Sequence, residues 1–232
     1  MTDPRPSPHS GRIAALILTA QFVLMGIAFL VLSSSINWPA SLDDPAAISL
    51  PRIFQEADAV RLGYSCYLVM ALLLIPASAA LNDRLGLKGP IAATTMALAV
   101  FSAMAKTIGI GRWLFAMPGL AQAYVAPGAD LDAIATVFTA LDSYAGGIGE
   151  VIGVGLMTGL WTLIIAGGVF ASPGLAAKIL GALAFLAGLS LFLTIPAGFG
   201  VELGPVLTLS NVGWLASFLA IGLWCLTPVR RV

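Results

Sequence analysis

Hydrophobic residues gather into six long runs, each bounded by a charge, a proline or a glycine cluster. The runs cover roughly residues 13–32, 60–81, 91–110, 147–171, 175–195 and 207–226. About 20 helical residues cross the hydrocarbon core of a membrane, which is about 30 Å thick. Continuous apolar runs favour helices, whose backbones satisfy their own hydrogen bonds in lipid, over the alternating strands of a membrane barrel. The pattern predicts an all-α, polytopic membrane protein with six transmembrane helices.

Composition supports this prediction. Hydrophobic residues make up 59% of the chain and charged residues 9%, whereas soluble domains carry about 45–50% and about 25%. So few charges cannot cover a water-facing surface, so we expect membrane lipid around a single transmembrane domain over residues 1–232. The net charge of +0 and the lack of a basic stripe give no reason to expect a nucleic-acid partner.

The first apolar run has two interpretations. Arg5 and Arg12 precede it and small serines follow it, as in a secretory signal peptide. The run is longer than the roughly 7–15 apolar residues of such a signal, and no A-x-A cleavage site follows. We therefore interpret it as an uncleaved helix after a flexible cytoplasmic tail, residues 1–11.

Lysine and arginine between the runs predict the orientation, because cytoplasmic segments are richer in these residues. With both termini inside, the cytoplasmic segments hold seven bases and the opposite segments three: Arg5, Arg12, Arg84, Lys88, Lys178, Arg230 and Arg231, against Arg52, Arg61 and Arg112. We expect an N-in, C-in protein of a bacterial inner (cytoplasmic) membrane.

Two connections on the outer side are long, residues 35–59 and 111–146. In the first, we expect a short amphipathic helix that begins at Pro51, since proline suits a first helical position. In the second, an apolar repeat at helical spacing predicts another amphipathic helix, with Leu131, Ile134, Phe138 and Leu141 on one face. The second element is either a structural lid over the helix ends or a segment that covers a ligand or binds a partner subunit.

The fourth apolar run begins with an informative pattern. One helical face carries Asp142, Gly146, Gly149, Glu150 and Gly153. Gly149 and Gly153 form a small-xxx-small pair, as do Gly155 and Gly159, and such pairs let helix backbones approach closely in lipid. We expect both pairs to pack against neighbouring helices.

A carboxylate beside a close-packed glycine face is unfavourable in a membrane unless it has a partner. The available bases are Lys106, Arg61 and Arg112. We expect Glu150 to point inward and to meet Lys106 or Arg61, with Asp142 nearby. The five charged residues should lie at the outer end of the bundle. They form either a polar, ligand-binding pocket or a set of ion pairs that fixes helix register.

The sequence offers no pattern for catalysis or for a cofactor. Its single histidine, His9, lies in the polar tail. Cys66 and Cys225 should sit at opposite membrane depths, beyond the ~7 Å Cα separation that a disulfide permits, so we expect free thiols. This leaves no cysteine and histidine spacing for a metal or haem site. No glycine-rich segment matches a phosphate loop.

Several short motifs resemble the bacterial membrane family called domain of unknown function 4386, over roughly Gly11 to Leu226. Arg61-Leu62-Gly63 looks like that family's step into its second helix, and Lys106 stands where a basic residue is common. The segment Leu141–Gly146 looks like the one that leads into its glycine-rich fourth helix, with Asp142 where a histidine is common. The resemblance implies the membrane fold, implies no activity, and implies that any chemistry of that histidine is missing here.

Three function classes remain. The leading hypothesis is a non-enzymatic membrane protein, either an accessory subunit or a binder of lipid or a small hydrophobic ligand. The alternative is a small secondary transporter: Pro76 and Pro196 interrupt the second and fifth runs in a faint internal symmetry, although we expect no ionisable residue at mid-depth. The third is a membrane enzyme that acts at the outer face through Asp142 and Glu150.

Overall fold

The computed structural model describes residues 9–227, and the regular structure of this part is entirely helical. Six helical passages are long and apolar enough to cross a membrane: Ser10–Ile36, Ala57–Leu85, Gly89–Tyr124, Leu131–Ala171, Leu175–Ala197 and Pro205–Cys225. The prediction of an all-α protein with six helices of the transmembrane type is confirmed.

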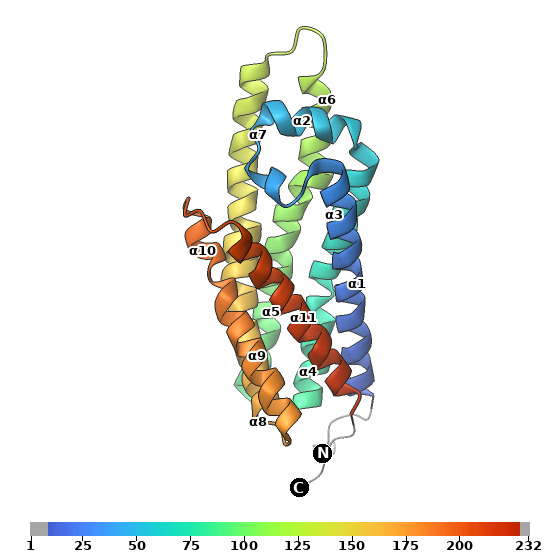
Figure 1. Cartoon of the computed structure of the whole chain (residues 1–232), viewed down its shortest axis with the longest axis vertical. Coiled ribbons are helices and arrows are strands. Elements are labelled where there is room, and N and C mark those ends of the chain that lie inside the picture. Colours follow the sequence, from blue (N-terminus) through green and yellow to red (C-terminus); the bar gives the residue numbers. More distant parts are fainter. Residues whose placement is uncertain (1–8, 228–232) are drawn as a thin grey trace.

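Several passages consist of more than one helical element (Figure 1). In chain order the elements are α1 (Ser10–Ile36), the 3-10 turn η1 (Ala40–Asp43), α2 (Ala46–Gln55), α3 (Ala57–Leu72), α4 (Leu74–Leu85), α5 (Gly89–Gly111), the π-helix η2 (Arg112–Ala116), α6 (Met117–Tyr124), α7 (Leu131–Gly146), the π-helix η3 (Gly147–Thr158), α8 (Gly159–Ala171), α9 (Leu175–Leu191), α10 (Thr194–Ala197) and α11 (Pro205–Cys225).

The first and last helices meet at one end of the bundle, which we call the proximal end (Figure 1). Gly11 of α1 lies against the carbonyl of Cys225, and no side chain would fit between them. Arg84 of α4 donates to the same carbonyl at 3.3 Å and to the carbonyl of Thr227 at 3.0 Å. Both ends of the described chain therefore lie at the same end of the bundle, so both should lie on one side of the membrane. Which side this is remains a prediction.

The expected tail over residues 1–11 is too long, because Ser10 and Gly11 already belong to α1. Residues 1–8 of the tail, with Arg5, and the C-terminal bases Arg230 and Arg231 lie outside the described residues.

Two hydrophobic cores follow one another along the bundle. The proximal core is built around Trp161, Leu81 and Phe218, with α1, α4, α8, α9 and α11 contributing to it. The core at the opposite, distal end surrounds Leu50, Tyr64 and Trp113, and α1, α2, α3, η2, α6 and α7 meet there. The continuous passage from α5 to α6 has 36 residues and is about 54 Å long at ~1.5 Å per residue. It exceeds a hydrocarbon core about 30 Å thick, so part of this passage extends beyond the lipid or crosses it at a tilt.

Most of the two long connections is helical in the structure. Residues 35–59 contain the end of α1, η1, all of α2 and the start of α3, and residues 111–146 contain η2, α6 and α7. The expectation that a helix begins at Pro51 is wrong, since α2 begins at Ala46, directly after Pro45, and Pro51 lies inside it. α7 begins where the side chain of Asp130 accepts a hydrogen bond from the amide of Ala133 at 3.1 Å, a common way to cap a helix.

Prolines mark the breaks within the passages. α3 gives way to α4 at Leu73, three residues before Pro76. Two residues separate the end of α9 at Leu191 from α10, which contains Pro196. Proline removes a backbone donor and clashes with the preceding turn, so it kinks a helix. The interruptions expected in the second and fifth passages are present.

Candidate functional site

Arg112 of η2 is the centre of the charged cluster at the distal end. Its buried guanidinium places Nε 3.2 Å from Oδ1 of Asp142, and a terminal nitrogen 3.4 Å from Oε1 of Glu150. The other terminal nitrogen donates to the backbone carbonyl of Asp142 at 3.0 Å. The guanidinium carbon lies 5.4 Å from the ring centroid of Trp113. One arginine thus connects η2 to both α7 and η3.

The sequence-based choice of partner for Glu150 was wrong. Arg61 lies on the surface and pairs with Asp58 at 3.4 Å, while Lys106 forms no ion pair with any described residue. Glu150 does not point inward either, because its side chain is 48% exposed. Gly149 and Gly153 of the same predicted face do pack against α5. At 3.6 residues per turn these glycines lie within about 20° of Asp142 around the helix, whereas Glu150 lies about 80° away, at the edge of that face.

The first glycine pair of η3 faces α5. A Cβ built on Gly149 would lie 2.9 Å from the Cα of Gly109. A Cβ on Gly153 would lie 3.1 Å from both the Cγ and the backbone nitrogen of Lys106. The two backbones approach so closely that a larger residue at Gly149 or Gly109 would push them apart.

The second pair faces the opposite neighbour. A Cβ on Gly155 would lie 3.2 Å from a side-chain carbon of Ile195 in α10, and one on Gly159 would lie 3.1 Å from the ring of Phe192. Glycines therefore let η3 and the start of α8 fit tightly between α5 on one side and the α9–α10 segment on the other.

Lys106 is separate from the Arg112 cluster. Its side chain is buried, with 5% of the residue exposed, and its amine lies 5.7 Å from the ring centroid of Trp214. Trp214 is the tenth of the 21 residues of α11, so the amine reaches the middle of a membrane-spanning helix. The expectation that no ionisable residue occupies mid-depth was wrong. Because Cα–Cβ bonds lean toward the helix N-terminus, the side chain of Lys106 extends from α5 toward the membrane centre.

Hydrogen-bonded side chains line the interior on the proximal side of Lys106. The pairs are Asn82 with Thr95 at 2.8 Å, Ser78 with Trp161 at 3.0 Å, Thr162 with Trp214 at 2.8 Å, and Ser102 with Thr158 at 2.8 Å. Such pairs connect helices in lipid, where polar groups lack water as an alternative partner. The bundle interior is therefore partly polar over most of its length.

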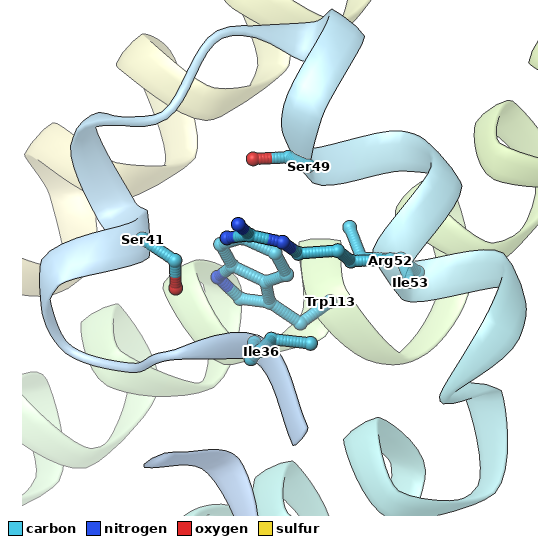
Figure 2. Close-up of a pocket in the computed structure, with 6 residues that line it drawn as sticks. All are labelled: Ile36, Ser41, Ser49, Arg52, Ile53 and Trp113. Carbon is cyan, nitrogen blue, oxygen red and sulfur yellow. The ribbon is translucent and has the colours of Figure 1, made fainter. Parts of the chain in front are cut away.

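A small cavity lies under α2 at the distal end (Figure 2). Ile36, Ser41, Ser49, Arg52, Ile53 and Trp113 line it. The buried hydroxyl of Ser41 has no hydrogen-bond partner among the described residues, while Arg52 is held by Asp44 at 2.9 Å. With a volume of about 10 Å³, the cavity has room for about one water molecule. It is too small for an organic ligand.

α9 and α11 are neighbouring helices of the bundle, and both are of the transmembrane type (Figure 1). A much larger groove runs between them. Its volume is about 510 Å³, within the roughly 300–1,000 Å³ of ligand pockets. Leucine, alanine and valine side chains together form most of the lining, and the polar groups are Ser190, Ser210 and Ser217. The hydroxyls of Ser190 and Ser210 are 2.8 Å apart and bond each other, so the groove surface is largely apolar.

Comparison with protein families agrees with the fold. A family model described as Domain of unknown function (DUF4386) matches residues 13–227. The chain belongs to this family. No curated protein and no solved structure gave a match. The resemblance inferred from the short motifs is thereby confirmed, and the DUF4386 match covers the charged cluster, Lys106 and both helices of the groove.

In this DUF4386 protein the acid at position 142 has a defined structural role. Asp142 supplies both a carboxylate and a backbone carbonyl to Arg112. A neutral imidazole would not provide the negative charge that this buried guanidinium meets. Residues 9–227 contain no group of three or more His, Cys, Asp or Glu side chains placed to hold a metal ion. Cys66 and Cys225 are free thiols, as expected.

The groove was not foreseen from the sequence. Its only local signal is the serines at positions 190, 210 and 217, which interrupt otherwise apolar runs. The contact between Lys106 and Trp214 also had no local signal, because it joins the third and sixth passages.

Proposed function

We propose that this protein is a non-enzymatic membrane protein that binds a lipid acyl chain or a small hydrophobic ligand in the groove between α9 and α11. The single observation that carries the proposal is the groove, with its volume of about 510 Å³ and its apolar lining. Because α9 and α11 are both of the transmembrane type, molecules dissolved in the bilayer reach the groove directly.

The chemistry of the lining supports an apolar ligand. Ser190 and Ser210 bond each other, and the hydroxyl of Ser217 donates to the backbone carbonyl of Trp214 at 2.8 Å. The hydroxyls are thus engaged, and the other lining residues are leucine, alanine, valine and glycine, with no charged residue among those that line the groove. Such a surface suits a hydrocarbon chain better than a polar metabolite.

Filling the groove tests the proposal. A Cβ added to Gly213 would meet no atom within 4 Å, so Gly213→Trp should occupy the groove without a backbone clash. Gly26→Trp is the matched control, because a Cβ there also meets nothing within 4 Å and Gly26 does not line the groove. The protein is reconstituted with a diazirine-bearing phospholipid, irradiated and mapped by peptide mass spectrometry.

We expect labelling to concentrate on groove residues of α9 and α11 in the unmodified protein and in Gly26→Trp. In Gly213→Trp it should fall several-fold. Labelling spread evenly over all lipid-facing helices, or unchanged by Gly213→Trp, would refute the proposed function.

A secondary transporter is the second candidate, and the position of Lys106 favours it. Its amine near the centre of α11, together with the breaks before Pro76 and Pro196, matches two features of transporters: a site near the midplane and discontinuous helices. Vesicles that contain the protein and a trapped pH dye would test proton-coupled transport. A proton flux that appears on addition of a substrate and is lost in Lys106→Met would favour the transporter, and absence of any flux would count against it.

We also propose a location and an orientation: a bacterial inner membrane with both termini in the cytoplasm. Seven predicted cytoplasmic bases against three on the other side support this.

A further inference from the structure

Lys106 has no anionic partner within the described part of the chain. Only 5% of the residue is exposed, no described carboxylate lies within 4 Å of its amine, and the contact that the amine makes is with the ring of Trp214 at 5.7 Å. A buried charge without a partner is strongly unfavourable in a membrane. A cation–π contact at this distance offsets only part of that cost.

The other buried bases show that this protein normally supplies partners. Arg112 meets two carboxylates and a backbone carbonyl. Arg84 donates to the carbonyls of Cys225 and Thr227. By contrast, the amine of Lys106 lies over an aromatic ring and has no acceptor within hydrogen-bonding distance among residues 9–227. The facing helix η3 carries one acid, Glu150, but this carboxylate is already paired with Arg112.

The side chain of Lys106 fits between the packed helices, but no described residue around it neutralises the charge of its amine. Gly153 leaves room for its stem, since a Cβ there would lie 3.1 Å from the Cγ of Lys106. The nearby hydroxyls of Ser102 and Thr158 bond each other and accept no bond from the amine. α11 packs mainly against α1 and α9, and the amine of Lys106 reaches it from α5 at Trp214.

We propose that the amine of Lys106 is a binding site for an anionic oxygen group, a carboxylate or a phosphate, on a ligand that enters the bundle core. The bound anion would supply the charge-assisted hydrogen bonds that no described residue supplies. Lys106 is not among the residues that line the α9–α11 groove, so this site goes beyond the proposed function and does not depend on it. The anion comes either from an amphiphile of the bilayer or from water, and the experiment separates these sources.

The test uses the full chain in a non-ionic detergent with four probes: oleate, its neutral analogue oleyl alcohol, acetate and inorganic phosphate. Lys106→Met keeps the length of the side chain and removes the charge, and Lys106→Arg keeps the charge. We expect oleate to bind Lys106→Met about tenfold more weakly than the unmodified protein, which corresponds to about 1.4 kcal/mol. Lys106→Arg should retain most of the affinity, and oleyl alcohol should not distinguish the proteins.

Lys106-dependent binding of oleate without competition by acetate or phosphate identifies an amphiphile from the membrane. Lys106-dependent binding of acetate or phosphate identifies a small anion from water. Equal affinity of the unmodified protein and Lys106→Met for all three anions overturns the proposal.

A second measurement needs no variant. A membrane-permeant acetylating reagent modifies Lys106 in the unmodified protein, and mass spectrometry follows the rate. A bound anion should slow the modification several-fold relative to oleyl alcohol. A rate that none of the three anions changes would also overturn the proposal, even if Lys106→Met does not fold.

Discussion

Replacing Arg112 should destabilise the protein more than any other change within its charged cluster. Arg112→Met leaves the carboxylate of Asp142 without its ion-pair partner and the carbonyl of Asp142 without its donor, and it removes the partner of Glu150. The two acids are not equivalent, since the Asp142 side chain is 23% exposed and that of Glu150 is 48% exposed.

These exposures set the expected magnitudes. Breaking a fully buried pair costs about 3–5 kcal/mol, whereas a solvent-exposed pair contributes about 0–1 kcal/mol. Asp142 is closer to the buried case and Glu150 is closer to the exposed one. We therefore expect Arg112→Met to lower the free energy of unfolding by about 2–4 kcal/mol and Glu150→Gln by about 1 kcal/mol or less. Asp142→Asn should fall between them, because the carbonyl contact to Arg112 survives.

The assay is reversible unfolding by SDS in mixed micelles, followed by far-UV circular dichroism. Arg61→Met is the matched control: it also removes one distal arginine, but from an exposed pair with Asp58, and it should leave the unfolding curve unchanged. If Arg112→Met behaved like Arg61→Met, or if Glu150→Gln were more damaging than Asp142→Asn, the cluster would not depend on Arg112 as its geometry indicates.

Three further predictions concern helix packing, topology and the thiols. Gly109→Ala should lower the free energy of unfolding by about 1–3 kcal/mol, because the new Cβ would lie 2.9 Å from the Cα of Gly149. Gly26→Ala is the control, since a Cβ there meets nothing within 4 Å. Equal effects of the two changes in the same SDS assay would contradict the close packing of α5 and η3. Alkaline phosphatase fused to the C-terminus should be inactive in cells, and high activity would reverse the assigned orientation. A maleimide should label Cys66, which is half-buried, faster than Cys225, which is buried, and reduction should not change the gel mobility of the monomer; faster labelling of Cys225 would show that the proximal core is open.

Much of the fold could be read from local sequence. Six apolar runs predicted six helices because the length of a membrane-spanning helix depends on the thickness of the lipid and little else. The glycine pairs of the fourth passage were visible for a similar reason, since close helix packing requires small residues at fixed spacing. The breaks before Pro76 and Pro196 followed from the missing backbone donor of proline.

The partners of the charged residues were decided by the tertiary structure. The α-helical face drawn through Asp142 and Glu150 predicted an inward carboxylate, but Glu150 lies at the edge of that face and its side chain is 48% exposed. Two bases that looked available to Glu150 are not used: Arg61 turns to Asp58, and Lys106 extends toward Trp214 instead. The direction of each side chain around its helix, rather than its depth along the bundle, therefore decided which charged residues pair.

Apolar periodicity specifies that a helix crosses the membrane, and it carries no information about which helix stands beside it. The groove between α9 and α11 and the contact between Lys106 and Trp214 both depend on such neighbours. The sequence by itself therefore determined the class, the number of spans and the glycine packing, while the relative placement of packed helices decided where a ligand or an anion finds a site. The physical reason is that every helix face exposed to lipid must be apolar. The sequence pattern is therefore the same on all of these faces, and only the packing of the helices makes one face different from another.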